Sequence, residues 1–420
     1  MKSLSLFNGP ALLATLLLSL PLAAQTAAPI PAAQDPQIES HTKAFLKALN
    51  SGGGKPLEQM APKDARAVLV GAQKSVKVDL SGITVTEKTI VQDGKSVKIT
   101  VVKPAGATGT LPAFMFFHGG GWVLGDFPTH ERMLRDLVVA SGAVGVFVNY
   151  TPSPEAHYPV AINEAYAATK WVAEHGKEIG VDGKRLAVAG NSVGGNMAAV
   201  VSLMAKDKKG PALRLQVLFW PVTNANFETA SYNQFATERF LTKTLMMWFW
   251  DNYTTNPAER KEIYASPLLA TTQQLAGLPP AFVQTAENDV LRDEGEAYAR
   301  KLDEAGVNVT AVRYNGMSHD WGLLNPLSQV PGTKSAMLHI TPKALNKRIT
   351  RYSNSTPNDV IKNRIILEAK RLLIHTQLSV KEIGYLLGYD DPSYFIRLFT
   401  KQVATPPQTF RLHYQHSATT

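Results

Sequence analysis

Gly190-Asn191-Ser192-Val193-Gly194 decides the fold, because it lies between an apolar run at 185–189 and a run of small and apolar residues at 197–203. The first run predicts a buried strand and the second a helix. Glycines two positions before and two positions after Ser192 permit the tight, strained turn that lifts a serine hydroxyl above a sheet edge. Gly-x-Ser-x-Gly alone is equally compatible with an ordinary turn. Its partners therefore decide what this one does.

Two residues further along the chain are candidates to activate Ser192. A serine is a weak nucleophile at its ordinary pKa and needs a base that a carboxylate orients. Asp289 follows the apolar run 281–286, and His319 follows the apolar run 307–314. Both runs predict buried strands, and sites on open α/β sheets collect where such strands end. We therefore predict a triad of Ser192, Asp289 and His319, in the order expected for α/β hydrolases.

Other acids and histidines compete for these roles. The rival carboxylates are Glu287, Asp293, Glu294 and Asp320. Asp293 and Glu294 fall in the first turn of a predicted helix, where carboxylates favour the helix dipole. Among the histidines, His157 is the main alternative to His319, but His319 stands out by its position after a predicted strand. Asp289 and His319 therefore stay the preferred pair.

A glycine-rich box at 118–122, His-Gly-Gly-Gly-Trp, follows the predicted strand 113–117. Consecutive glycines let backbone N–H groups approach a developing oxyanion. A phosphate-binding loop would continue with Gly-Lys-Ser/Thr, whereas this one continues with Trp-Val-Leu. We predict an oxyanion hole formed by the N–H groups of Gly119, Gly120, Gly121 and Val193.

With these elements in this order, residues from about Lys43 to about Met337 resemble the hormone-sensitive-lipase-like esterases. That bacterial family carries an HGGGW box and a GDSAGG-type elbow. The similar stretches are 116–125, 190–196 and 289–298. The last is similar to the family's DPLRDEGEAYA, which makes Asp289 the triad acid by position.

The resemblance implies an α/β-hydrolase fold, an eight-stranded, mostly parallel sheet under a helical cap. It also implies short-chain acyl esters as substrates, Gly120 and Gly121 as the usual oxyanion donors, and a frequent homodimer. Two positions depart from the family pattern, since Asn191 replaces the usual Asp and Val193 the usual Ala. Val193 still supplies its N–H, and we expect its branched side chain to narrow the acyl pocket.

Two segments, at about 37–70 and 225–262, are the predicted cap. The stretch 37–49 is helix-like, and 227–253 is rich in aromatic residues. Core packing would account for about half of those aromatics. The others are expected to line an apolar substrate pocket. The candidate pocket residues are Trp122, Phe240, Leu241 and Trp248.

The N-terminus has the outline of a secretory signal peptide. Residues 11–24 are apolar, follow Lys2 and precede small residues, so we predict a signal peptide at 1–28 and a disordered linker at 29–42. Ser19 and Pro21 interrupt a run already too short for a membrane anchor. The chain has no cysteine, which excludes disulfides and a lipidated cysteine. We expect a periplasmic or secreted protein if the leader is used, and a cytoplasmic one otherwise.

The last 82 residues concentrate the positive charge. Residues 339–420 hold 12 Lys and Arg against 5 Asp and Glu, which is +7 of the whole chain's +9. A positive electrostatic field of this kind favours binding to nucleic acid, although many basic tails are explained by a solvated basic face. The stretch 379–389 predicts a short amphipathic helix ended by glycine, and 391–399 predicts a second helix with a proline near its start. This is a helix-turn-helix pattern, and a long helix at 358–375 is predicted before it.

This segment resembles the C-terminal DNA-binding domain of AraC-type regulators, including the closing Thr-Pro-Pro-Gln-Thr-Phe-Arg at 405–411. By that resemblance Ser393, Tyr394 and Arg397, with Asp391, would lie near the DNA groove, and Lys401 and Arg411 near phosphate. Of the two helix-turn-helix units of that family, only the second helix of the first, 341–348, is visible before the complete unit. The esterase pattern and the AraC-type pattern meet near 337–340, where each is cut short. This indicates a recombined or chimeric chain.

The sequence thus predicts a hydrolase domain at 43–338 and a truncated, all-α helix-turn-helix domain at 339–420. We expect a serine carboxylesterase that needs no metal or cofactor. Three alternatives stay open: a transcription regulator whose hydrolase fold senses a ligand, an amidase or peptidase on the same triad, and a tail retained to cover hydrolase surface. Export and binding of chromosomal DNA exclude one another for a single molecule.

Overall fold

The structure is a computed structural model of the 420-residue chain. It describes residues 30–339, 366, 369–370, 372–374, 376, 378–387 and 392–416. The predicted leader 1–28, the predicted helix 341–348, Asp391 and most of the predicted helix 358–375 lie outside the described residues.

Eight strands form one sheet in the order β1-β2-β4-β3-β5-β6-β7-β8. The strands are β1 (Ile83–Gln92), β2 (Lys95–Pro104), β3 (Leu111–Phe117), β4 (Val144–Asn149), β5 (Val181–Asn191), β6 (Leu213–Phe219), β7 (Ala281–Asn288) and β8 (Val309–Ser318). The pairs β1–β2 and β2–β4 are antiparallel, and all pairs from β4 to β8 are parallel. The predicted fold class is confirmed.

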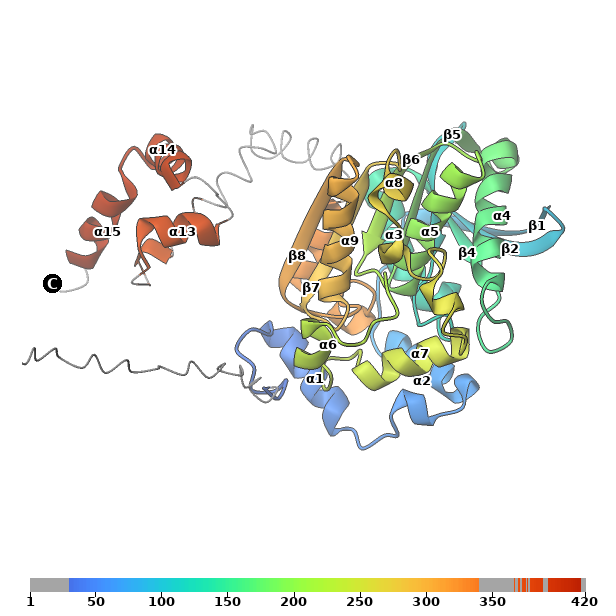
Figure 1. Cartoon of the computed structure of the whole chain (residues 1–420), viewed down its shortest axis with the longest axis horizontal. Helices are drawn as coiled ribbons and strands as arrows, with labels where there is room; N and C mark the ends of the chain where they lie inside the picture. Colours follow the sequence, from blue (N-terminus) through green and yellow to red (C-terminus); the bar gives the residue numbers. More distant parts are fainter. Residues whose placement is uncertain are drawn as a thin grey trace, which may run out of the picture.

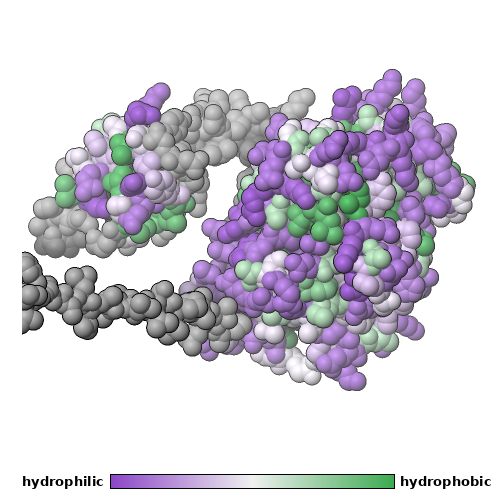
Figure 2. Space-filling model, in the orientation of Figure 1, coloured by the Kyte–Doolittle hydropathy of each residue, from purple (hydrophilic) through white to green (hydrophobic). Residues whose placement is uncertain are grey.

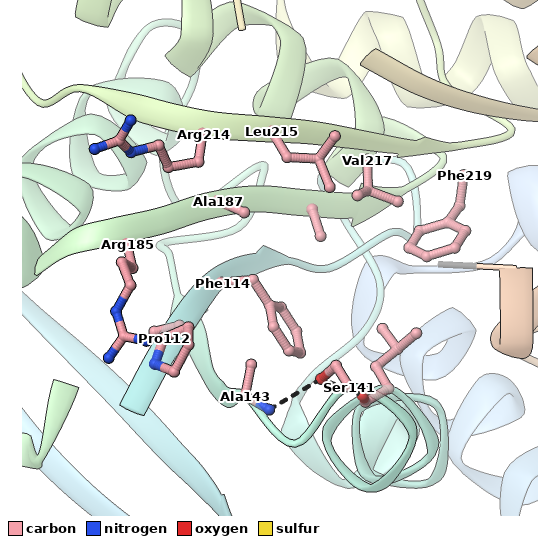
Figure 3. A pocket seen from close by; sticks show the side chains of 13 residues that line it. Pro112, Phe114, Ser141, Ala143, Arg185, Ala187, Arg214, Leu215, Val217 and Phe219 are labelled. Carbon is pink, nitrogen blue, oxygen red and sulfur yellow. Dashed lines mark hydrogen bonds between the residues drawn. The ribbon is translucent and has the colours of Figure 1, made fainter. Parts of the chain in front are cut away.

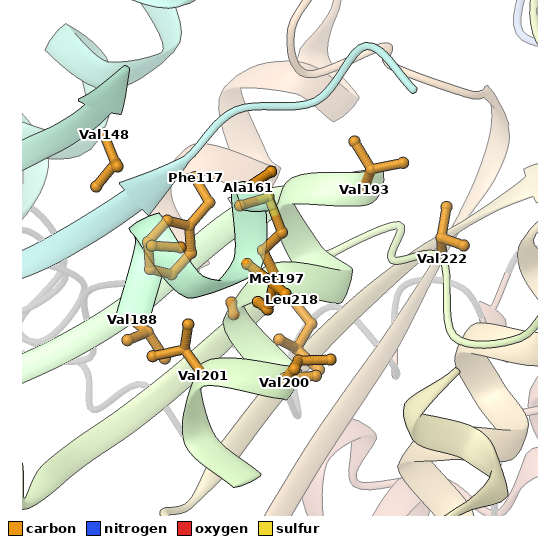
Figure 4. Packing of buried hydrophobic residues seen from close by; sticks show 14 of the residues in the cluster. Phe117, Val148, Ala161, Val188, Val193, Met197, Val200, Val201, Leu218 and Val222 are labelled. Atoms are coloured by element: carbon orange, nitrogen blue, oxygen red, sulfur yellow. The ribbon is translucent and has the colours of Figure 1, made fainter. Parts of the chain in front are cut away.

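Helices cover both faces of the sheet (Figure 1). One face carries α3 (Phe127–Ser141) and α10 (Pro331–His339), and the other carries α4 (Val160–His175), α5 (Val193–Asp207) and α9 (Arg292–Glu304). All residues of α5 from 193 to 205 are buried. Figure 4 shows Val193, Met197 and Val200 of this helix packed among strand side chains such as Phe117 and Leu218. Because α5 is buried all round, its start cannot shift without opening the core.

The cap lies beyond one end of the strands (Figure 1) and contains α1 (Ser40–Ser51), α2 (Pro62–Lys74), α6 (Ala230–Gln234) and α7 (Lys243–Tyr253). The prediction of a disordered linker at 29–42 is wrong for its described part. Ala32 and Ile38 are buried, and Asp35 forms a buried ion pair with Arg239 at 2.8 Å. The small residues and prolines of this stretch suggested disorder, but a distant arginine and an apolar surface hold it in place.

An apolar cavity of about 430 Å³ lies on the sheet face that carries α3 (Figure 3). Phe114, Ala187 and Val217 line it from three strands, while Arg185 and Arg214 lie at the end away from Phe219. None of the predicted triad residues lines this cavity. It is therefore separate from the predicted catalytic machinery.

The C-terminal domain contains α13 (Val380–Leu386), α14 (Pro392–Val403) and α15 (Pro407–His416). A reciprocal pair of hydrogen bonds between Ser379 and Glu382 caps the start of α13. Phe395, Phe399 and other apolar side chains form a core of its own. The predicted helix-turn-helix domain is confirmed.

Polar and charged side chains cover much of the surface seen in Figure 2, with apolar areas between them. Within the part of the chain that the structure describes, no helix combines the length and the apolar character needed to cross a bilayer.

Candidate active site

The turn at Ser192 joins β5 to α5 with almost no intervening chain. β5 ends at Asn191 and α5 begins at Val193. Ser192 between them has φ 56° and ψ −121°, a backbone conformation that residues with a side chain rarely adopt. A Cβ atom at Gly194 would collide with the carbonyl oxygen of Phe117, and one at Gly190 would collide with the carbonyl of Gly194. The two glycines are needed because neighbouring backbone fills the space of a side chain.

The structure brings Ser192, His319 and Asp289 together at the carboxyl ends of their strands. His319 Nε2 lies 3.0 Å from Ser192 Oγ, and Asp289 Oδ2 accepts from His319 Nδ1 at 2.7 Å. Asp289 Oδ1 accepts from the N–H of Leu291 at 3.0 Å, which fixes the carboxylate. All three triad side chains are buried. The arrangement can pass a proton from serine to histidine while the carboxylate holds the ring.

Electrostatics favour the protonated form of His319 in spite of its burial. Removal of the ring from water lowers its pKa, but the carboxylates of Asp289 and Asp320 outweigh that effect and raise the pKa above the ordinary 6.5. A base whose protonated form is stabilised in this way accepts a proton from a serine more readily.

The glycine box lies beside the serine turn, with its first N–H already bound. Gly119 donates to Asn191 Oδ1 at 3.0 Å, so its N–H points away from the predicted oxyanion hole. Gly120 and Gly121 both have positive φ, 99° and 65°. The prediction that Gly119 is one of the four oxyanion donors is therefore wrong, because its N–H holds the loop to Asn191 instead. The N–H groups of Gly120, Gly121 and Val193 stay the predicted donors.

His118 anchors this box, a role that the sequence did not reveal. Its ring stacks on Tyr150 with centroids 4.1 Å apart, and Tyr150 Oη donates to the His118 carbonyl at 3.0 Å. Burial lowers the pKa of His118 to about 4, so the ring is neutral in the physiological range. A neutral, stacked ring fixes the start of the glycine loop.

The rival acids and the alternative histidine have other partners. Glu287 and Asp293 accept hydrogen bonds from backbone N–H groups. Glu294 accepts from the N–H of residue 223 at 2.6 Å, and burial raises the pKa of its carboxyl well above its usual range. His157 binds a cap carbonyl through Nδ1. Asp289 alone of the candidate acids binds His319 Nδ1 in the described structure.

The four predicted pocket residues lie in different surroundings. Trp122 is buried and stacks on Tyr253 with centroids 4.0 Å apart, and Leu241 is buried in the main core. Phe240 packs against an apolar cluster at the N-terminal end of the cap. Trp248 is half-buried on α7.

Phe249 is the cap residue that sequence reasoning missed. A Cβ atom on Gly121 would collide with the Phe249 ring, so this ring lies directly against the oxyanion loop. The aromatic richness of 227–253 pointed to the right segment. It could not tell which ring faces Gly121, because that depends on how α7 is rotated about its axis.

On α14, the predicted DNA contacts Ser393, Arg397 and Lys401 are exposed. The side chain of Tyr394 lies outside the described residues. Arg411 is buried and donates to the carbonyl oxygens of two residues in the domain, so its predicted place near phosphate is wrong. The resemblance identified a characteristic arginine but not its direction, which is inward.

Known esterases are similar to the hydrolase domain in sequence, and solved ones are similar in fold as well. A thermostable esterase from Pseudomonas putida ECU1011 is 73% identical, with a TM-score of 0.72 over 73% of this chain and 96% of that one. A carboxylesterase of Mycobacterium tuberculosis H37Rv, NlhH, is 36% identical over 61% of this chain and 81% of its own. An ethyl acetate hydrolase from Pseudomonas putida is 31% identical over 66% of this chain and 90% of its own.

Two family profiles divide the chain as its structure does. One, for the α/β hydrolase fold, matches residues 114–323, and another, for a helix-turn-helix domain, matches residues 335–413. Together with the esterase relatives and the geometry around Ser192, these matches agree with the two resemblances found in the sequence. The chain therefore belongs to the hormone-sensitive-lipase-like α/β hydrolases and is a carboxylic ester hydrolase that carries a C-terminal helix-turn-helix domain of AraC type.

Proposed function

We propose that this protein hydrolyses short-chain carboxylic esters through an acyl-enzyme formed on Ser192. The observation that carries the proposal is the continuous chain of contacts from Asp289 through His319 to Ser192, at 2.7 and 3.0 Å. These separations lie within the reach that proton transfer to a general base requires.

In the first step Ser192 Oγ attacks the ester carbonyl carbon while its proton passes to His319 Nε2. The carbonyl electron pair moves to oxygen, where the N–H groups of Gly120, Gly121 and Val193 stabilise the charge. His319 then gives its proton to the departing alkoxide, and the C–O bond to the alcohol breaks. Water then loses a proton to His319 and attacks the acyl carbon, and the C–O bond to Ser192 breaks as Oγ takes the proton back from His319, which releases the acid.

The preference for short acyl chains is supported by the crowding around the serine. Ser192 is only 4% exposed, and Phe249 of the cap lies against Gly121. One relative, the ethyl acetate hydrolase, bears the name of an ester with a two-carbon acyl group. We expect acyl chains of roughly two to six carbons to react fastest, because the Phe249 ring beside Gly121 leaves less room for longer chains.

A series of p-nitrophenyl esters with graded acyl length tests the proposal. Ser192→Ala should lower kcat/KM by on the order of a thousandfold or more. Ser202→Ala is the matched control, because Ser202 is a buried serine on the same helix α5 whose hydroxyl donates to a helix carbonyl. Full activity of Ser192→Ala would contradict the mechanism, and fast hydrolysis of long-chain triglyceride would contradict the chain length. An anilide tests the amidase alternative, because the triad alone does not select the leaving group.

We propose as a second function that the C-terminal domain binds DNA. The exposed Arg397 and Lys401 on α14, the second helix of the helix-turn-helix pair, favour it. Phosphate contacts by such residues make affinity fall steeply with salt.

Selection of duplexes from a random library by the full chain would identify a preferred site. Anisotropy measured against salt concentration should then show weaker binding and a shallower slope for Arg397→Ala/Lys401→Ala. Lys63→Ala, on the hydrolase cap, is the control and should bind normally. Equal affinity for all sequences, unchanged in the double variant, would contradict this function.

A further inference from the structure

We propose that Asp320, held in place by Asn191 and Trp220, is a positioning residue that stabilises the protonated His319 formed during catalysis. The inference rests on the proposed mechanism at Ser192. It concerns a second carboxylate beside the triad, which the triad geometry itself does not require.

The Asp320 carboxylate is buried and fixed from two sides. Its Oδ1 accepts from Trp220 Nε1 at 2.7 Å and from Asn191 Nδ2 at 3.1 Å. Its Oδ2 lies 3.9 Å from His319 Nε2, the nitrogen that receives the serine proton. This distance is too long for a hydrogen bond, so Oδ2 acts on the ring through its charge alone. Asp320 therefore faces His319 at the nitrogen opposite the one that Asp289 binds.

Asn191 is the residue that makes this arrangement possible. It is completely buried, and its amide accepts from Gly119 N at 3.0 Å while donating to Asp320. An ionised aspartate, the residue type that the family usually has here, could accept from Gly119 but could not donate to a second carboxylate. Two carboxylates at that spacing cannot both stay ionised. Asn191 and Asp320 therefore depend on one another.

The pair connects three parts of the active site. Asn191 is the last residue of β5 before the nucleophile, Gly119 belongs to the oxyanion loop, and Asp320 follows the catalytic histidine. When Ser192 loses its proton, positive charge appears on His319 between the carboxylates of Asp289 and Asp320. These two are the groups whose charges act on the His319 ring in the described structure. Their combined field favours the charged state that precedes the tetrahedral intermediate.

The variant Asp320→Asn tests the charge of Asp320 separately from its hydrogen bonds. The asparagine Oδ1 can still accept from Trp220 and Asn191, while the negative charge facing His319 is lost. We expect the acid limb of the kcat/KM profile to move to lower pH by roughly one unit, because His319 becomes harder to protonate. We expect kcat on the plateau to fall about three- to tenfold. If Asp320 had only a structural role, its replacement would lower activity without moving the acid limb of the pH profile.

Asn191→Asp tests the pair from the other side. It keeps an acceptor for Gly119 but sets two carboxylates against each other, so we expect kcat/KM to fall by roughly ten- to a hundredfold. The acid limb should not move to lower pH, because no negative charge is removed. Asn191→Asp/Asp320→Asn, which relieves the repulsion, should be more active than Asn191→Asp alone.

Asp303→Asn, an exposed aspartate on α9, is the matched charge control and should behave as wild type. Circular dichroism and thermal unfolding show whether each variant is folded. The proposal is overturned if folded Asp320→Asn has the wild-type acid limb and kcat. Should Asp320→Asn not fold, Asn191→Asp decides, and a shift of its limb to lower pH overturns the proposal. Failure of the serine mechanism is recognised separately, because Ser192→Ala would then stay active.

Discussion

The hydrolase domain and the C-terminal domain place their polar side chains differently. The hydrolase domain buries a set of ionisable and amide groups around its serine, among them Asn191, Asp289, His319 and Asp320. In the described part of the C-terminal domain the buried set is apolar apart from Arg411, and Arg397 and Lys401 are exposed. We therefore expect that substitutions of these buried polar residues alter the catalytic chemistry of the hydrolase domain. Substitutions of buried residues in the C-terminal domain should alter only the stability of that domain.

The largest expected effect concerns the interior of the hydrolase domain. Asp289→Asn keeps the shape but no longer selects the correct ring tautomer, so kcat should fall by about 10³ to 10⁴. Steady-state hydrolysis of a short aryl ester measures it, with Asp303→Asn as control. DNA retention by the same variant should match wild type. A loss of less than tenfold would show that the buried carboxylate does not serve the chemistry.

The core of the C-terminal domain gives the next largest effect. Phe399 is completely buried between Phe395 and Phe410, with ring centroids 6.1 and 5.6 Å away. Phe399→Ala should cost about 3 to 5 kcal/mol, enough to unfold a small domain. Limited proteolysis and thermal unfolding should show this loss, while kcat/KM stays at the wild-type value. A parallel loss of esterase activity would show that the hydrolase domain needs a folded C-terminal domain. That result would support the alternative in which the tail is retained to cover hydrolase surface.

The smallest expected effect is a displaced pH profile. Neutral His319 is the active base, so activity falls as pH decreases through its pKa, which is raised above 6.5. The acid limb of wild-type kcat/KM should therefore lie above pH 6.5. Rates measured from about pH 5 to 9 locate it. A limb below 6.5 would show that burial of the ring outweighs the two carboxylates.

The sequence allowed the triad to be predicted because each member follows or ends a strand, and parallel strands bring their carboxyl ends to one edge. It could not reveal the pairing of Asn191 with Asp320, which are 129 positions apart and meet only when the sheet is formed. The ion pair of Asp35 with Arg239, 204 positions apart, was hidden for the same reason. Such contacts depend on side-chain direction at strand ends and in loops, which no periodicity encodes.

The left-handed backbone at Ser192 has a consequence for the durability of the enzyme. A residue with a side chain at φ 56° and ψ −121° holds on the order of 1 to 3 kcal/mol of conformational strain that glycine would relieve. Ser192→Gly should therefore withstand heat better than the active protein, although it has no nucleophile. At this one position, catalysis and resistance to heat favour different residues.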